Sequence, residues 1–203
     1  MTVRLRKLQS KDRIGMLEWM HDIDTAKYFR DDMLAKTEQD VLKFIEQADL
    51  APQNGKSVHY AIVEETDMYL GTISLKSINF QDRNAEYAIS LRRAAQGKKI
   101  AYVATKELLD IAFNQFDLER VYLNVLSKNE RAIRLYEKCG FVLEGEFRNH
   151  LCLNGQYQNL RWYAMLKTEY QKLGYMCVGG GNTFLIDSIY SLFEQWAERR
   201  LAA

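Results

Sequence analysis

The segment Gln96-Gly97-Lys98-Lys99-Ile100-Ala101 has the residue types of an anion-binding loop. It follows a strand-like run at 86–91 and opens a helix-like run at 101–113. The first backbone N–H groups of a helix have no intrahelical partners, and the aligned peptide dipoles place partial positive charge there. A phosphate can use both features, so this loop predicts a phosphate site, although many similar loops bind nothing.

A second group of chemically useful side chains lies in the segment 129–141. Asn129 and Tyr136 are seven residues apart, about two helical turns, so both can lie on one face of a helix. A phenol with a pKa near 10 keeps its proton at neutral pH and can donate it to a departing group. Tyr136 is therefore a candidate general acid, although taken alone it could equally be a core aromatic.

The two segments together resemble the GNAT superfamily of acetyl-CoA-dependent N-acetyltransferases. The matching pieces are, in chain order, the 96–101 loop, Asn129, Ala132, Tyr136 and the Gly140-Phe141 pair. The resemblance extends over residues 1–170 and is closest to branches that acetylate ribosomal-protein N-termini, polyamines and amino sugars. It implies an enzyme that uses acetyl-CoA as cosubstrate, without a metal, and acetylates the amine of a small molecule.

The resemblance also implies an α+β fold with a mixed, mostly antiparallel sheet flanked by helices. Its central strands, here 84–91 and 120–125, would splay apart, and the pantetheine arm of coenzyme A would lie in the gap. The pyrophosphate would rest on the 96–101 amides, and Asn129 would hydrogen-bond the arm, cap its helix, or both. The cofactor-binding residues implied in this way are Ile89, Ser90, Leu91, Gln96, Gly97, Lys98, Lys99, Ile100, Ala101, Asn124, Asn129, Ala132 and Tyr136.

One residue departs from the family pattern, which has glycine where this chain has Lys99. A side chain there restricts the backbone and could crowd the phosphate. A lysine with a negative φ could still present its N–H group to the ligand. The departure predicts weakened cofactor binding and keeps open another class of function, a catalytically inactive acyl-CoA-binding module.

Acetyl transfer to an amine requires proton transfers at both ends of the reaction. An alkyl amine has a pKa near 10.4, so a base or a water chain leading to one must take its proton before attack. Glu86 is the leading base, because it begins the strand that should border the acceptor and stands at a family position that is often acidic; it could also be an ordinary strand-edge carboxylate. His150 is a second possible proton acceptor, and the resemblance assigns Tyr136 as the acid that protonates the departing thiolate.

The acceptor is expected to contact residues 19–36, the 77–83 loop and the last hairpin. The expected substrate-binding residues are Trp19, His21, Asp22, Tyr28, Phe29 and Glu86. Aromatic rings can stack on a sugar or a nucleobase, and carboxylates can hold an amine, so an amino sugar and a polyamine both fit this cluster; a solvated acidic face is the simpler alternative. The 19–22 region is similar to amino-sugar acetyltransferases, so the main prediction is an amino sugar, free or nucleotide-linked. A spermidine-like polyamine and a ribosomal-protein N-terminus are the alternatives.

The composition limits the class of protein. A chain of 203 residues that is 47% hydrophobic can form one large domain with a sizeable core. Its formal net charge of +1 argues against general nucleic-acid or membrane-surface binding. There is no apolar run near the roughly 20 residues that cross a bilayer, and the first residues lack the apolar stretch of a secretory signal. With three cysteines, an odd number, these features predict a cytoplasmic protein.

The elements expected around these groups mix strands and helices. A helix is expected from Ser10, with Ile14, Leu17 and Trp19 as its apolar stripe, and another after Thr37, which resembles a cap paired with Asp40. The remaining expected elements are strands at 3–8, 58–64, 69–77, 84–91, 121–125, 141–153 and 157–166, and helices at 101–113 and 131–138. The Asn154-Gly155 pair between the last two strands is a strong hairpin signal.

The last part of the chain is expected to be an appendage. We expect an acetyltransferase domain at 1–173 and a tail at 174–203, in which three glycines at 179–181 form a joint. Residues 183–200 carry apolar side chains at helical spacing, including Leu185 and Trp196. Such a helix would either fold back on its own domain or mediate a homodimer.

Overall fold

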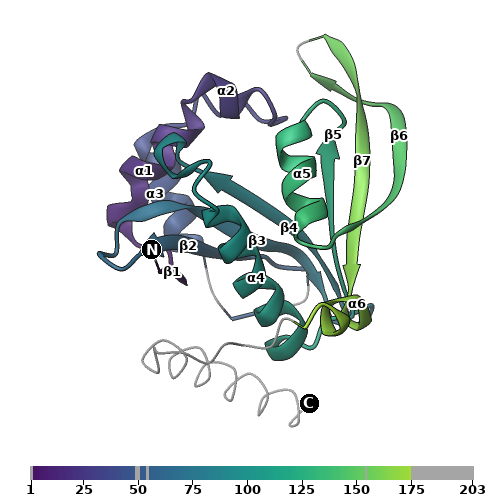
Figure 1. Ribbon diagram of the computed structural model, residues 1–203. Helices are drawn as coiled ribbons and strands as arrows, with labels where there is room; N and C mark the ends of the chain where they lie inside the picture. The colour runs from purple at the N-terminus through teal and green to yellow at the C-terminus, as the bar shows by residue number, and fades with distance from the viewer. Residues whose placement is uncertain (1, 49–50, 54, 154, 175–203) are drawn as a thin grey trace.

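An open, seven-stranded sheet forms the centre of the molecule. The computed structural model describes residues 2–48, 51–53, 55–153 and 155–174. The strand order is β1-β2-β3-β4-β5-β7-β6 (Figure 1). The strands are β1 (Val3–Lys7), β2 (Val58–Glu64), β3 (Tyr69–Asn79), β4 (Asn84–Leu91), β5 (Arg120–Leu126), β6 (Val142–Leu153) and β7 (Gln156–Leu166). All neighbouring strands are antiparallel except β4 and β5, which are parallel.

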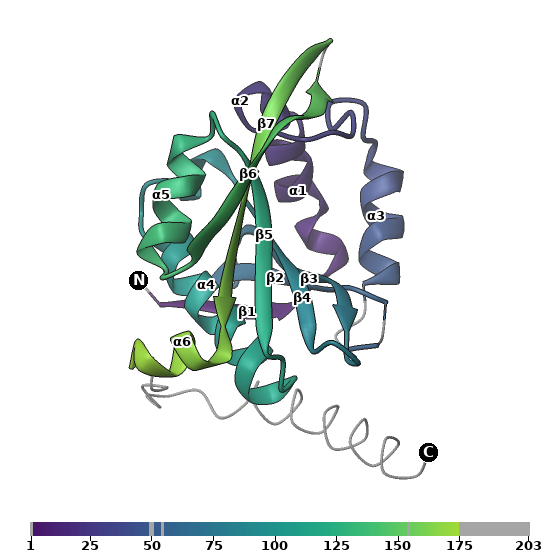
Figure 2. The same ribbon diagram turned by 90° about the vertical axis from the view of Figure 1, so that its right-hand side faces the viewer.

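Helices cover both faces of this sheet (Figure 2). α4 (Ile100–Asp110) and α5 (Glu130–Lys138) lie on one face, and α1 (Arg13–Met20) and α3 (Glu38–Gln47) lie on the other. The shorter elements are α2 (Ile23–Ala26), α6 (Lys167–Lys172), the 3-10 turns η1 (Ser10–Asp12) and η2 (Arg93–Ala95), and a π-helical turn, η3 (Ile111–Gln115). The predicted α+β fold with a mixed, mostly antiparallel sheet is therefore confirmed.

The predicted separation of the two central strands is also confirmed. β4 and β5 pair over only three positions, from Asn84 with Arg120 to Glu86 with Tyr122. Beyond Glu86 the two strands diverge, as Figure 1 shows, and no described strand fills the gap between them. Glu86 therefore marks the base of a fork in the sheet.

Two apolar clusters hold the layers together. The larger lies between the sheet and the α4–α5 layer and includes the fully buried Ile73, Leu108 and Phe113. The smaller lies under α1 and α3 and includes Met16 and Trp19. Each such side chain contributes about 1.5–3 kcal/mol when it leaves water, so both clusters anchor the strands that border the fork.

The two expected N-terminal helices compare differently with the structure. Thr37 caps α3 as predicted: its hydroxyl accepts the Asp40 amide, and the Asp40 carboxylate accepts the Thr37 amide. The helix expected from Ser10 is present, because a 3-10 turn at Ser10–Asp12 leads directly into α1. Within its expected apolar stripe Trp19 is buried, whereas Ile14 is 68% exposed, and Met16 packs with Trp19 in the smaller cluster.

Later elements follow the expected order with small shifts in their ends. α4 begins at Ile100 and α5 at Glu130, one residue earlier than predicted in each case. β6 and β7 form the predicted antiparallel hairpin, whose turn residue Asn154 lies outside the described residues. The predictions for the tail at 175–203 also lie outside the described residues. The short α2 and α6 were not predicted, because a helix of one turn has too little apolar periodicity to detect.

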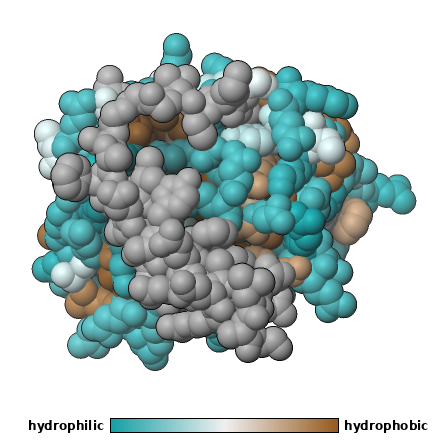
Figure 3. Space-filling model, turned by 90° about the horizontal axis from the view of Figure 1, so that it is seen from below, coloured by the Kyte–Doolittle hydropathy of each residue, from teal (hydrophilic) through white to brown (hydrophobic). Residues whose placement is uncertain are grey.

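The described surface seen from below is mainly hydrophilic, and its hydrophobic residues form separate patches (Figure 3). Within the described residues, none of the helices has the length and apolar character needed to cross a bilayer.

Candidate active site

A large cleft opens above the fork between β4 and β5. Its volume is about 940 Å³, and it is lined by both diverging strands, α5, the start of α4 and the segment around α2. The described residues of the β6–β7 hairpin contribute His150, Leu151 and Leu160 to one margin. The cleft therefore has two ends: one at the 96–101 loop and one between α2 and the base of the fork.

The 96–101 loop presents main-chain N–H groups to the first end. Lys99 is the N-cap of α4, and the N–H groups of residues 97–102 donate to no acceptor among the described residues. Gly97 has a φ of +77°, and a Cβ at that position would meet nothing within 4 Å. These open donors at a helix start are what a diphosphate requires, so the residues present fit coenzyme A.

Lys99, which stands where the family pattern has glycine, adopts a left-handed backbone conformation that is unfavourable for any residue with a Cβ. Its φ is +63°, in the left-handed region, rather than the negative value that a lysine prefers. A residue with a Cβ loses roughly 1–2 kcal/mol there, so this turn carries local strain that glycine would avoid. Lys99 lines the cleft, whereas Lys98 does not.

Gln96 joins the loop to both of its neighbours. Its Nε2 donates to the carbonyl of Leu91 at 3.2 Å, and its Oε1 accepts Nη1 of Arg131 at 2.6 Å. The side chain thus ties the end of β4 to α5 across the phosphate end of the cleft. Gln96, which was predicted to bind the cofactor, therefore fixes the shape of the loop. The predicted residues Ile100 and Ala101 line the cleft as well.

The edges of the diverging strands offer backbone groups to the middle of the cleft. Ile89, Ser90 and Leu91 line it from β4, and Asn124 lines it from β5. Their inner edges are unpaired beyond Glu86, so N–H and C=O groups are open to an extended ligand with amides of its own. A pantetheine arm has that chemistry, and the predicted strand residues all border this space.

Asn129 caps α5. Its Oδ1 accepts the Ala132 amide at 3.2 Å, so one of its two expected roles is present. Asn129 and Ala132 both line the cleft beside Tyr136. The cap fixes the first turn of α5 and thereby the face that presents Tyr136 to the cleft.

Tyr136 lies at the junction of the cleft and the core. It is 8% exposed, and its ring packs edge-on against Tyr87 at 5.8 Å between centroids. Burial raises the pKa of the Tyr136 hydroxyl above its ordinary value of 10, so the group keeps its proton at neutral pH. No described residue forms a hydrogen bond with this hydroxyl, so its proton is available to a ligand atom in the cleft.

Glu86 stands at the base of the fork with one oxygen engaged and one open. Its Oε1 accepts both Nζ of Lys76 at 3.0 Å and Nδ2 of Asn124 at 3.3 Å. Its Oε2 has no partner among the described residues, and Glu86 lines the cleft. The carboxylate can therefore accept a hydrogen bond or a proton from an amine while remaining fixed in place.

The expected substrate-binding residues separate into two groups. Asp22, Tyr28 and Phe29 line the cleft beside α2, together with Glu86 across from them. Trp19 does not: it is 5% exposed, and its indole N–H donates to the Tyr69 hydroxyl at 3.0 Å. The large apolar ring is needed in the cluster under α1 and α3, so Trp19 supports Phe29 from behind at 5.7 Å instead of facing a ligand.

His21 is likewise outside the cleft lining. Its Nε2 lies 2.9 Å from the carbonyl oxygen of Lys36, and the side chain is exposed. His21 is the C-cap residue of α1. The prediction that Trp19 and His21 contact the substrate is corrected on these grounds.

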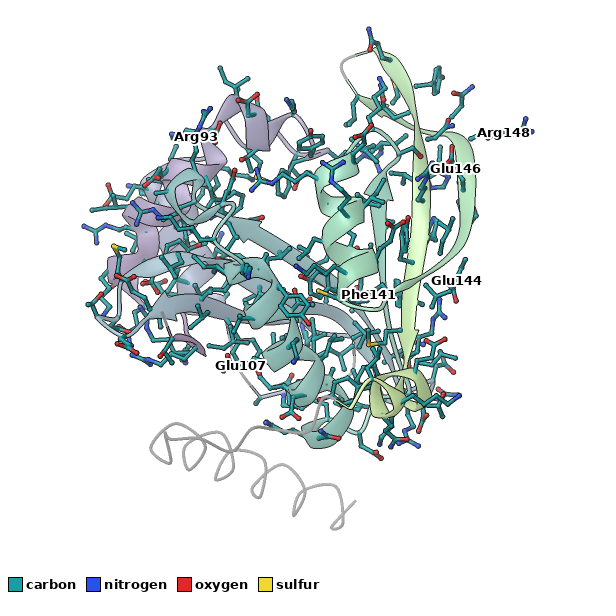
Figure 4. The ribbon with its side chains drawn as sticks, in the orientation of Figure 1. Arg93, Glu107, Phe141, Glu144, Glu146 and Arg148 are labelled. Carbon is teal, nitrogen blue, oxygen red and sulfur yellow. The ribbon has the colours of Figure 1, made fainter. Side chains whose placement is uncertain are left out.

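Sequence analysis missed two cations at the acceptor end. Lys76 reaches Glu86 because β3 and β4 pair these residues directly, which the register of the predicted hairpin could have indicated. Arg93 lies in η2 beside α2, 3.7 Å from Asp22 and 3.6 Å from Asp24 (Figure 4). No local pattern places Arg93 there, since the contact joins segments about 70 residues apart.

The forked sheet, the open amide loop and the buried tyrosine define an acyltransferase that binds an acyl-coenzyme A. Residues 2–142 match the family model described as an acetyltransferase (GNAT) domain. The chain is 32% identical over 171 residues to spermidine N(1)-acetyltransferase of Escherichia coli K12, which spans 83% of this chain and 88% of that protein. It is 33% identical over 101 residues to a putative ribosomal N-acetyltransferase of Bacillus subtilis, which spans 50% of this chain and 55% of that protein.

Solved structures show the same architecture. A Vibrio cholerae spermidine N-acetyltransferase in complex with CoA and spermine superposes with a TM-score of 0.74 at 25% identity, covering 83% of this chain and 98% of that one. A GNAT-family acetyltransferase from Bacillus anthracis shares the fold with a TM-score of 0.72 at 21% identity, covering 83% and 96%. The chain belongs to the GNAT acetyltransferase family and is an acetyl-CoA-dependent N-acetyltransferase.

Proposed function

We propose that this enzyme acetylates a primary amine of a polyamine such as spermidine. The observation that carries the proposal is the 32% identity to a spermidine N(1)-acetyltransferase, because that similarity extends over 83% of the chain. The expected amino-sugar acceptor finds no counterpart among these relatives, and the polyamine alternative is better supported. The 19–22 region on which the amino-sugar prediction rested holds Trp19 and His21, neither of which faces the cleft.

The charges at the acceptor end are compatible with this substrate. Glu86 already accepts an ammonium group, that of Lys76, at 3.0 Å, and Asp24 accepts that of Lys27 at 3.1 Å. Asp22 borders the same space and is 12% exposed. The ammonium groups of a polyamine have the same chemistry as these lysines, so the open Oε2 of Glu86 and the carboxylates beside α2 can hold them at two separate points.

The residues at the fork support a direct transfer. Glu86, directly or through a water molecule, takes the proton of the attacking amine, whose nitrogen then forms the new bond to the acetyl carbon. The carbon–sulfur bond breaks, and the proton of the Tyr136 hydroxyl goes to the departing sulfur. The second proton that the nitrogen loses as the amide forms restores the Tyr136 hydroxyl. The 97–101 amides and the strand edges hold the acetyl donor in place during these steps, which reduces the entropy lost on reaching the transition state.

A panel of acceptors tests the proposal. Free thiol released from acetyl-CoA would be measured with spermidine, spermine, a peptide carrying a ribosomal-protein N-terminus, and a nucleotide-linked amino sugar. We expect kcat/KM for spermidine or spermine to exceed the others by at least about tenfold, the factor that 1.4 kcal/mol of discrimination gives. A preference for the peptide or the amino sugar contradicts the proposal, and acetyl-CoA binding without turnover on any amine supports the inactive binding module.

A further inference from the structure

The ion pair between Lys76 and Glu86 leaves one carboxylate oxygen open. Nζ of Lys76 at 3.0 Å and Nδ2 of Asn124 at 3.3 Å both donate to Oε1 of Glu86. Two other carboxylates of the sheet, Glu144 and Glu146 on β6, have donors on both of their oxygens. Oε2 of Glu86 has no partner among the described residues, and Lys76 and Glu86 both line the cleft. The pair can therefore accept one further donor from the cleft.

The backbone of β3 places Lys76 at the base of the fork. Lys76 stands directly opposite Glu86 in the antiparallel pair of β3 and β4, which lie side by side in Figures 1 and 2. The register of this pair shifts immediately after Lys76, and Ser77 has a φ of +49°. Irregularities of this kind recur next to active sites, where they direct a side chain. The side chains of Lys76 and Glu86 are 38% and 23% exposed, so water screens their charges only in part.

A lone carboxylate has opposite effects on the binding of an amine and on its reaction. It attracts the ammonium form, and a nearby opposite charge raises the pKa of the amine further above its ordinary value of about 10.4. The ammonium form has no lone pair with which to attack the thioester. A carboxylate that bound the acceptor by itself would therefore hold the acceptor in its unreactive form.

We propose that Lys76 is a positioning residue for acetyl transfer, which leaves Oε2 of Glu86 to the acceptor nitrogen and offsets the negative charge of this carboxylate. This role rests on the proposed function, in which Glu86 accepts the proton of the amine. Two nitrogens then share one carboxylate, and like charges held this close disfavour each other, so the acceptor nitrogen is held as a neutral amine. The proton that it gives up passes through Glu86 to solvent water, and its lone pair is free to form the bond to the acetyl carbon.

A neighbouring imidazole already responds to the same charge. His59, on β2, pairs with Ser74, and its Nδ1 lies 2.7 Å from the Ser74 hydroxyl oxygen. Ser74 is two residues before Lys76 on β3, so the two side chains lie on one face of the sheet. Burial, and after it the positive charge of Lys76, lower the pKa of His59 to about 4. A nitrogen base near Lys76 is thus neutral at neutral pH, as we expect for the acceptor nitrogen.

The neighbours of Glu86 on β5 bring no second cation to the carboxylate. Tyr122 pairs with Glu86 at the base of the fork, and burial together with the charge of Glu86 raises the pKa of its hydroxyl, which stays neutral. Arg120 lies 5.8 Å from the centre of the Tyr122 ring, and its guanidinium donates to Glu144. Among the described residues, Lys76 is thus the cation in contact with Glu86.

The distal nitrogens of a polyamine would meet different surroundings. Asp22 lines the cleft beside α2, across from Glu86. Arg93 lies 3.7 Å from Asp22 and is 72% exposed, so it forms no hydrogen bond there and water screens its charge. A distal nitrogen beside Asp22 keeps its proton and its charge, whereas the reacting nitrogen beside Lys76 does not.

Steady-state kinetics on the full-length protein test this role, with saturating acetyl-CoA and the amine that the unmodified enzyme turns over best. Lys76→Met keeps the length of the side chain but removes its charge, so the acceptor binds Glu86 more tightly as an unreactive ammonium. We expect kcat and the KM of the amine both to fall about tenfold, the factor that one pKa unit gives. Lys76→Arg keeps the charge and should keep both values close to those of the unmodified enzyme.

The matched control is Lys167→Met, which removes the charge of a lysine that pairs with Asp117 away from the cleft and should change neither value. Circular dichroism and the Kd of acetyl-CoA check that each variant is folded. Every comparison uses one amine, so a preference for the peptide or the amino sugar contradicts the polyamine acceptor without bearing on Lys76. An unchanged kcat in Lys76→Met, a lower kcat with a raised KM, or an arginine variant that behaves like the methionine variant would each overturn the role of Lys76. Absence of turnover on every amine would overturn both proposals.

Discussion

The two ends of the cleft are built in different ways. The cofactor end consists mainly of backbone: contiguous open amides at 97–101, open strand edges and a helix start. The acceptor end consists of charged side chains, among them Asp22, Glu86 and Arg93, brought together from separate elements. The difference teaches that the cofactor end relies on backbone groups, which every residue type carries, whereas the acceptor end is built from particular side chains joined by long-range ion pairs.

The largest expected effect is the loss of kcat when the Tyr136 hydroxyl, which lies between the two ends of the cleft, is removed. Tyr136→Phe removes the hydroxyl while keeping the ring that packs on Tyr87 and Phe141. We expect kcat to fall about 10³-fold with little change in the Kd of acetyl-CoA, as for loss of a general acid. Thiol release and a binding titration measure the two quantities. Tyr157→Phe, at a position 69% exposed, is the control; an unchanged kcat for Tyr136→Phe would remove the proposed acid.

The second prediction concerns the stability of α4, the helix that begins at the cofactor end, and its dependence on pH. Burial raises the pKa of Glu107, on α4, from 4.5 to about 7, while the Leu5 amide donates to its carboxylate at 3.0 Å. The folded state therefore binds a proton more tightly than the unfolded state, and stability falls as pH rises from about 4.5 to about 7. Over that window the shift corresponds to about 3 kcal/mol.

Urea unfolding at pH 5 and pH 8 measures this dependence. Glu107→Gln keeps an oxygen for the Leu5 amide but cannot ionise, so we expect its stability to lose most of the pH difference. Glu119→Gln, at a surface position 48% exposed, is the matched control and should retain it. Equal pH slopes in the Glu107→Gln variant and the unmodified protein would refute the assigned role of burial.

The third prediction addresses the acceptor end directly. Glu86→Gln keeps the shape of the side chain but removes its capacity to take a proton from the amine. We expect kcat to fall about 10²-fold, because the amide cannot take a proton from the attacking amine. Glu65→Gln serves as the control. A variant with full activity would show that another group accepts the proton.

The fourth prediction compares two adjacent lysines of the cofactor loop. Lys99→Gly should raise the free energy of unfolding by about 1 kcal/mol, because glycine adopts the left-handed φ of +63° without strain. Lys98→Gly, next to it at a residue without positive φ, should lower the free energy of unfolding by about 0.5–1 kcal/mol. Chemical denaturation distinguishes them. The same sign for both variants would contradict the conformational explanation.

The smallest effect concerns Arg93. Its nitrogens lie 3.6–3.7 Å from Asp22 and Asp24, beyond hydrogen-bond distance, so it acts mainly by charge. Arg93→Gln leaves these carboxylates to the substrate, and we expect KM for spermidine to fall about threefold, in the range of an exposed ion pair. Arg134→Gln, on an ion pair of α5, is the control. A raised KM would indicate that Arg93 positions α2 rather than competing with the amine.

The same difference between the two ends explains what could be predicted from sequence. The amide loop and the Asn129–Tyr136 face depend on neighbouring residues, so local spacing identified them. The fork joins strands from separate parts of the chain, and only the family resemblance indicated it. The acceptor residues come from α2, β3, β4 and η2, and no local pattern shows that Arg93 reaches Asp22. Trp19 shows the same limit: its type suits a ligand or a core equally, and only the packing of α1 on β3 decides between them.

The most direct test is a crystal structure of the enzyme with coenzyme A and spermidine. The account predicts diphosphate oxygens within hydrogen-bond distance of N–H groups at 97–101, the sulfur beside the Tyr136 hydroxyl, and an amine nitrogen of spermidine at Oε2 of Glu86. A diphosphate bound elsewhere, or a polyamine bound away from the fork with Glu86 still open, would contradict it.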